Sequence, residues 1–136
     1  MSETLNKELV LIEANAVAYL TAFNREDVAG VLATYADDGV LMAPGRSAVV
    51  GKDALAIIYP EVFEQVDFAM SYEIKEVVQI SDDWAFVRSA TKGTETNKAT
   101  SVVISSEYQE LFLLRKSATG AWQTARYSTS KISPMI

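Results

Sequence analysis

The sequence predicts an α+β fold in which helices come first and strands follow. Apolar residues recur every three to four positions over residues 5–35 and 55–63, which is the spacing of buried helix stripes. From about residue 68 onward they recur at every second position, which is the spacing of a strand. Because the helical patterns precede the strand patterns, we expect three helices packed on one face of an antiparallel sheet rather than alternating β-α units.

The helical part divides into three segments. The first helix is expected to run to about Asn24, and its buried stripe consists of Leu5, Leu9, Ile12, Ala16, Tyr19, Leu20 and Phe23. Asp27 can cap a short second helix, which should include Tyr35 and end at the doublet Asp37-Asp38. A third helix should span roughly residues 52–66 and split into two pieces at Pro60, because proline lacks a backbone donor.

The remaining segments read as strands. Residues 40–43 and 48–50 flank Pro44-Gly45 and should form a small hairpin. Four longer strands are expected over residues 68–80, 84–94, 102–116 and 122–132, as an antiparallel meander. The doublets Asp37-Asp38 and Asp82-Asp83 are better explained as solvated turns than as carboxylate pairs for catalysis or cation binding.

Length and composition restrict the function. A chain of 136 residues with 49% hydrophobic content suits one domain over residues 1–136. The net charge of -6 disfavours nucleic acid and anionic membranes as partners. The sequence has no cysteine and no histidine, so we expect no disulfide, imidazole base or metal site, and no cofactor. Acidic residues interrupt the apolar residues of the first twenty positions, so a cytoplasmic location is expected.

Three parts of the sequence carry a family resemblance. The stretch from Tyr19 to Leu41 resembles the opening of nuclear-transport-factor-2-like enzymes such as ketosteroid isomerase. Residues 83–94, and residues 110–116 followed by 122–127, are similar to the SnoaL-like branch, which is grouped with polyketide cyclases and ketosteroid-isomerase-like proteins. The resemblance implies a cystatin-like cone, in which a strongly bent sheet wraps the first helix and leaves a pocket at its open end.

The resemblance also implies roles for individual residues. In ketosteroid isomerase, a tyrosine on the first helix and a protonated aspartate bind the oxyanion, while a second aspartate moves the proton. Tyr19 corresponds to that tyrosine, and Glu110 falls near the oxyanion-binding acid. Ala43 occupies the position of the base. The standard isomerase base is therefore missing.

Three charged residues lie within otherwise apolar strands, namely Arg88, Glu110 and Arg126. Burying an unpaired charge is costly, so we expect these side chains to meet. If Leu114 pairs with Trp122, Glu110 lies opposite Arg126, and a slip of one residue would place them on opposite faces. The cluster can be a structural ion pair, or an arginine anchor for a ligand anion with Glu110 as acid or base. The candidate catalytic residues are thus Glu110, Tyr19, Arg88 and Arg126.

Aromatic and apolar residues supply candidate pocket walls, which are Phe23, Tyr35, Met42, Tyr72, Trp84, Phe86, Phe112 and Tyr127. The functional prediction is a pocket for a small apolar molecule such as a carbonyl compound, with isomerase, cyclase or hydratase activity. The alternative is a non-catalytic association or ligand-binding domain. Leu111 and Leu113 alternate with Phe112 and Leu114, so both faces of this strand need cover and a homodimer is expected.

Overall fold

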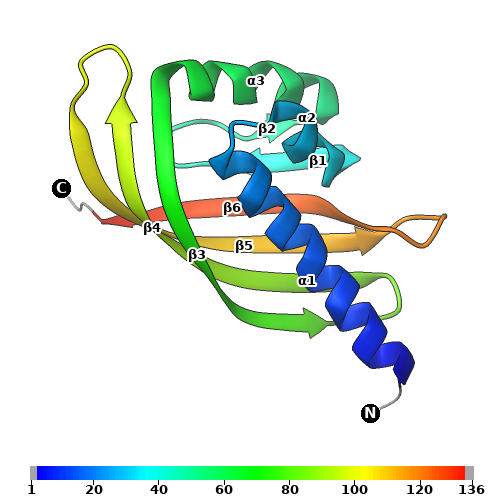
Figure 1. Cartoon of the computed structure of the whole chain (residues 1–136). Helices are drawn as coiled ribbons and strands as arrows, with labels where there is room; N and C mark the ends of the chain where they lie inside the picture. The colour runs from blue at the N-terminus through cyan, green and yellow to red at the C-terminus, as the bar shows by residue number, and fades with distance from the viewer. Residues whose placement is uncertain (1–2, 134–136) are drawn as a thin grey trace.

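The protein is described by a computed structural model covering residues 3–133 (Figure 1). Its three helices are α1 (Glu3–Asn24), α2 (Val28–Ala33) and α3 (Lys52–Gln65). Its strands are β1 (Tyr35–Met42), β2 (Val49–Val50), β3 (Val66–Gln79), β4 (Trp84–Asn97), β5 (Val103–Lys116) and β6 (Trp122–Ser133). They form one sheet in the order β2-β1-β6-β5-β4-β3.

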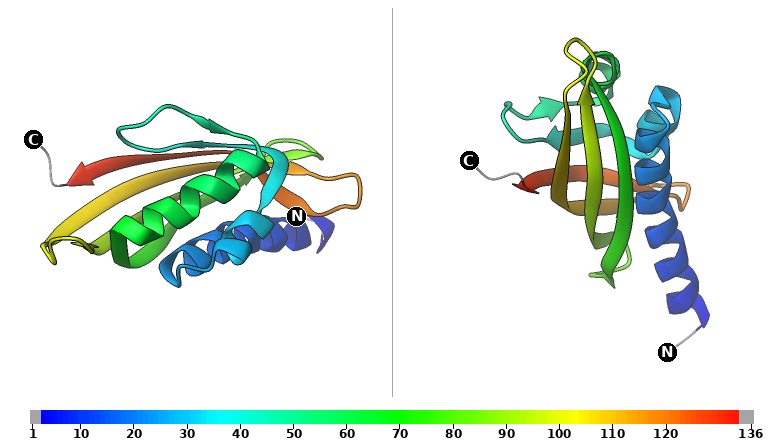
Figure 2. Two further views of the ribbon diagram at one scale, coloured as in Figure 1. Left: turned by 90° about the horizontal axis from the view of Figure 1, so that it is seen from above. Right: turned by 60° about the vertical axis from the view of Figure 1, so that its left-hand side comes forward.

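The sheet is curved and open, and all three helices lie on its concave side (Figure 2). α1 runs along this side, while α3 lies at the same end of the molecule as β1 and β2 (Figure 1). The core lies between helices and sheet, where Ile12 from α1, Leu55 from α3, and Phe112 and Leu114 from β5 are fully buried. Burial of these apolar side chains is the main favourable contribution to folding.

The first helix ends at Asn24 as predicted, and Asp27 caps α2 by accepting a hydrogen bond from the Gly30 amide at 2.9 Å. The second helix is shorter than expected. It stops at Ala33, and Tyr35 begins β1 instead of completing a helical stripe. Asp37-Asp38 is therefore not a turn but an exposed part of β1. The cause is tertiary pairing, because β1 forms a parallel ladder with β6 that outweighs the local stop signals.

The expected break of the third helix at Pro60 is wrong, since α3 continues as one helix from Lys52 to Gln65. The missing Pro60 donor would have bonded the carbonyl of Ala56. Ala56 is exposed, so water can bond that carbonyl instead. Buried Tyr59 and Phe63 flank the proline and hold the helix against the core.

The four long strands are confirmed as consecutive antiparallel pairs, and Val40↔Val50 and Leu41↔Val49 confirm the small hairpin. The sheet as a whole is mixed, because β1 adds to the meander in parallel beside β6. No helix within the described range is long and apolar enough to cross a membrane.

Candidate functional site

A cavity of about 250 Å³ lies between α1, α3 and the concave face of the sheet. One part of its wall is apolar and includes Leu20, Phe23, Val62, Phe68 and Met70. Another part carries oxygen atoms and includes Tyr19, Tyr59, Thr91, Glu110, Tyr127 and Thr129. Apolar walls with a few polar groups are typical of sites for small organic molecules.

Three tyrosine hydroxyls form a chain behind the polar wall. The Tyr59 Oη lies 2.6 Å from the Tyr19 Oη and 2.7 Å from the Tyr35 Oη. Tyr19 comes from α1, Tyr59 from α3 and Tyr35 from β1, so the chain joins both long helices to the sheet. All three side chains are buried. Tyr19 and Tyr59 line the cavity, whereas Tyr35 lies behind them.

The tyrosine chain can supply one hydrogen-bond donor to a ligand. Burial raises the pKa of Tyr19, Tyr35 and Tyr59 well above the ordinary range, so the hydroxyls keep their protons at neutral pH. Two hydroxyl contacts use two of the three protons. When Tyr35 donates to Tyr59 and Tyr59 donates to Tyr19, the remaining proton belongs to Tyr19 at the cavity wall.

Glu110 places a carboxyl group on the same cavity. It lies on β5 directly opposite Ser89 on β4, and its side chain is only 4% exposed. The Ser89 hydroxyl donates to Glu110 Oε1 at 2.7 Å, and the Thr91 hydroxyl donates to Oε2 at 2.8 Å. Among residues 3–133, no cation forms a salt bridge with this carboxyl group.

Opposing effects act on the ionisation of Glu110. Burial raises its pKa above the ordinary value, while the hydrogen bonds from Ser89 and Thr91 partly offset this rise. Glu110 therefore gains and loses its proton at a pH closer to neutrality than an exposed glutamate does. That property is required of a group that takes a proton and returns it.

The expected meeting of Arg88, Glu110 and Arg126 is wrong. Glu110 pairs with Thr129 across β5 and β6, and Arg126 pairs with Leu113. Ala125 is the extra residue of a β-bulge in β6, beside Leu113. The bulge shifts the alternation of side chains between the two sheet faces, so Arg126 points outward.

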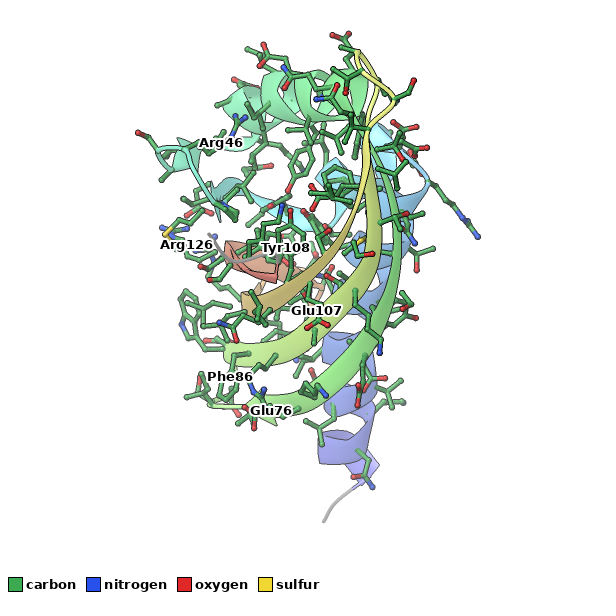
Figure 3. The ribbon with its side chains drawn as sticks, turned by 90° about the vertical axis from the view of Figure 1, so that its left-hand side faces the viewer. Arg46, Glu76, Phe86, Glu107, Tyr108 and Arg126 are labelled. Atoms are coloured by element: carbon green, nitrogen blue, oxygen red, sulfur yellow. The ribbon has the colours of Figure 1, made fainter. Side chains whose placement is uncertain are left out.

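Both arginines have partners outside the cavity. Arg88 bonds Glu76 Oε1 on β3 at 2.9 Å, and its side chain is about half exposed. Arg126 is exposed and donates to the Asp38 carbonyl at 3.1 Å. In Figure 3, Glu76, Phe86 and Arg126 lie on the side of the sheet away from α1. Neither arginine lines the cavity, so neither is placed to bind a ligand with Glu110.

The predicted pocket residues separate into three groups. Phe23, Tyr72 and Tyr127 line the cavity. Tyr35 and Phe112 are buried behind its wall, and the Phe112 ring stacks on Tyr127 with centroids 4.5 Å apart.

The third group lies outside the cavity. Met42, Trp84 and Phe86 are not among its lining residues. Met42 and Trp84 are exposed, and the Trp84 ring lies under the Arg115 guanidinium at 5.6 Å. Phe86 pairs with Leu113 on the sheet face opposite the helices.

Ala43, the residue in place of the isomerase base, lines the cavity. An alanine supplies no proton acceptor there. The sequence interpretation missed other polar residues at the site, namely Ser89, Thr91, Tyr59, Tyr108 and Arg46. Tyr59 is spaced by four from both Leu55 and Phe63, which places it on the buried stripe of α3. Ser89 and Thr91 follow Val87 at every second position, which places them on the same strand face. The sequence pattern could therefore have identified these three residues.

Comparison with known proteins identifies the family. The SnoaL-like domain family matches residues 16–128. The chain therefore belongs to the SnoaL-like domain family, which confirms the resemblance drawn from the sequence.

The solved structures agree. A ketosteroid isomerase-like protein from Erwinia carotovora atroseptica SCRI1043 is 74% identical, with a TM-score of 0.93 over 95% of this chain and 99% of that one. A conserved protein from Planctomyces limnophilus DSM 3776 shares 22% identity and a TM-score of 0.76 over 93% of this chain and 99% of that one.

A third structure bears on the fold alone. An NTF2-like protein with a cystatin-like fold from Novosphingobium aromaticivorans has 13% identity and a TM-score of 0.72, over 97% of this chain and 86% of that one. The cystatin-like α+β fold is thereby confirmed. No curated protein matches the sequence.

Proposed function

We propose that this protein binds a small, largely apolar carbonyl compound and moves a proton next to the carbonyl group, as an isomerase, cyclase or hydratase does. The observation that carries the proposal is the placement of the Tyr19 hydroxyl and the buried Glu110 carboxyl on one cavity. A hydrogen-bond donor and a proton acceptor that face one ligand are the two groups that enolisation needs.

In the proposed chemistry, Tyr19 stabilises the ligand oxygen and Glu110 transfers the proton. Tyr19 donates a hydrogen bond to the ligand oxygen and stabilises the negative charge that develops there. Glu110, as a carboxylate, removes a proton from the carbon next to the carbonyl group. The same carboxyl group then returns the proton to the ligand, so no proton is gained or lost overall. Ser89 and Thr91 keep the carboxyl group in one orientation through their hydrogen bonds.

Cavity size supports a small ligand. About 250 Å³ lies just below the range of roughly 300–1,000 Å³ that is typical of sites for drug-sized molecules. A domain used for association alone would be expected to fill its cone with its own aromatic side chains. Tyr35 and Phe112 do fill the region behind the wall, but space remains in front of Tyr19 and Tyr127.

The experiment is hydrogen-deuterium exchange of 1-tetralone in D₂O, followed by NMR at the carbon beside its carbonyl group. The wild type should accelerate exchange above the buffer rate. Glu110→Gln should lower the enzymatic rate by about a hundredfold or more, because it removes the proton acceptor. Tyr19→Phe should lower it by about ten- to a hundredfold, through loss of a donor to the oxyanion.

Glu107→Gln is the matched control, because Glu107 is an exposed acid on the same strand and does not line the cavity. It should exchange 1-tetralone at the wild-type rate. Binding of 1-tetralone without accelerated exchange would favour the alternative, a non-catalytic ligand-binding domain. Exchange that survives in Glu110→Gln would contradict the role of Glu110.

We further propose that the outer face of the sheet is covered by a second copy of the chain. Met42, Leu111 and Trp84 expose between 36% and 46% of their surface there, beside the half-buried Phe86 and Leu113. Exposed apolar side chains on one sheet face, here interspersed with Arg88 and Arg126, are typical of an interface. Light scattering at micromolar concentration should give a dimer mass, and Leu111→Glu should shift it toward the monomer. A monomer mass for the wild type would contradict the proposal.

A further inference from the structure

Arg46 places a positive charge at the cavity. It belongs to the segment between β1 and β2, lines the cavity and is exposed. Within residues 3–133, no salt bridge or side-chain hydrogen bond involves its guanidinium group, whereas Arg88, Arg115 and Arg126 each bond an oxygen of the protein. Figure 3 shows Arg46 beneath α3, with Tyr108 on the sheet below it.

The two charged side chains on the cavity wall differ in depth. Glu110 is buried at 4% exposure, whereas Arg46 is exposed and therefore lies at the rim. Among the described lining residues, these are the only two with side chains that carry a full charge. A ligand with a negative group is repelled by the Glu110 carboxylate and attracted by Arg46. The wall thus favours one orientation, with the negative group outward and the neutral end inward.

We propose that Arg46 binds a carboxylate at the outer end of the ligand, so that the protein prefers small cyclic or aromatic oxo acids and binds neutral ketones more weakly. This inference rests on the proposed function, because it assumes that the inner end of the ligand meets Tyr19 and Glu110. The apolar body of the ligand then lies against Phe23, Phe68 and Met70. Arg46 acts as a residue for binding and specificity and takes no part in proton transfer.

A carboxylate fits this rim better than a phosphate. The planar guanidinium group matches a carboxylate through two parallel hydrogen bonds. A phosphate monoester carries up to a second negative charge, and the described lining residues supply no second cation for it. The net charge of -6 also disfavours a doubly charged ligand.

The test compares three probes of similar size by calorimetric titration at pH 7.5, namely 1-naphthaleneacetate, its neutral amide and 1-naphthyl phosphate. The wild type should bind the carboxylate about five- to twentyfold more tightly than the amide. Arg46→Gln should abolish this preference while binding the amide as the wild type does. Arg25→Gln, which removes the same charge from an exposed site outside the cavity lining, should keep the preference.

The outcomes separate the two proposals. Equal binding of carboxylate and amide by the wild type would overturn the role of Arg46 and leave the pocket proposal standing. Binding of none of the three probes would overturn the pocket proposal and this inference together. A preference that persists in Arg46→Gln would show that another group selects the carboxylate. Tighter binding of the phosphate than of the carboxylate would overturn the assigned ligand class.

Discussion

The two faces of the sheet at β5 differ in the burial and the hydrogen bonding of their polar and charged groups. On the inner face, Glu110 is buried and each of its carboxyl oxygens accepts a bond from a neighbouring hydroxyl group. On the outer face, Leu111 is exposed, and Arg126 of the neighbouring β6 bonds two backbone carbonyls, those of Asp38 and Ala125. Alternation along the strands therefore separates Glu110 from Arg126, although their charges are opposite.

Substitutions on the two faces should also differ in how much they lower the free energy of unfolding. Removing a partner from a buried polar group leaves that group unsatisfied, which costs about 1–3 kcal/mol. Removing an exposed charge costs little, because water replaces the partner. Substitutions on the inner face should therefore lower stability more than substitutions on the outer face.

The largest effect is expected for Tyr59→Phe on the inner side. This change keeps the ring but removes the hydroxyl group that contacts both Tyr19 and Tyr35. Loss of two buried hydrogen bonds should lower the free energy of unfolding by about 2–4 kcal/mol. Urea unfolding measures it, with Tyr72→Phe as the exposed control. A loss no greater than that of the control would mean that the tyrosine chain is not formed.

A second pair of variants sets Ser89 against Arg126. Ser89→Ala leaves one oxygen of Glu110 without its donor and should cost about 1–3 kcal/mol of unfolding free energy. Arg126→Leu should cost less than about 1 kcal/mol, since Arg126 is exposed and does not pair with Glu110. A cost of several kcal/mol for Arg126→Leu would restore the ion pair that the sequence suggested.

A smaller effect is expected from pH. Burial raises the pKa of Glu110, so the folded state holds its proton where the unfolded state has lost it. Glu110 thus lowers stability as pH rises from its ordinary pKa through the folded pKa, by at most about 1.4 kcal/mol per pH unit. The difference in unfolding free energy between wild type and Glu110→Gln, followed from pH 4 to 8, should show this fall.

Asp38 on the outer side should behave in the opposite way. A hydrogen bond from Arg115 lowers the pKa of Asp38, so its contribution is present at neutral pH and is lost as pH falls. Replacing Asp38 with asparagine should therefore flatten the acid side of the stability profile. If the two substitutions, at Glu110 and at Asp38, changed the pH dependence of the unfolding free energy in the same direction, the expected difference between the faces would be contradicted.

Periodicity predicted most of the fold. The long helix, the four long strands and the Asp27 cap depend on local spacing and capping, which a single sequence displays. The start of β1 at Tyr35 could not be predicted, because it depends on parallel pairing with β6, which lies about ninety residues away. The continuity of α3 through Pro60 could not be predicted, because it depends on whether the carbonyl of Ala56, which lacks its helical donor, faces water.

The site was predicted in part. Family resemblance placed Tyr19 and Glu110, and both line the cavity. The partners of Glu110 could not be predicted, because the irregularity at Ala125 sets the register of β6 and leaves no local sign in the sequence. Arg46 was missed because a loop arginine gives no periodic signal, and only the folded chain places it at the rim.

The ionisation of Glu110 itself can be followed by ¹³C NMR of the labelled glutamate carboxyl carbons, with the Glu110 resonance assigned by comparison with Glu110→Gln. We predict that Glu110 titrates above the ordinary glutamate range, and that 1-tetralone moves its resonance while leaving that of Glu107 in place. Titration at or below the ordinary value, together with a resonance that 1-tetralone does not move, would contradict the proposed role of Glu110 in proton transfer. Glu110 would then be a structural group of the sheet that faces no ligand.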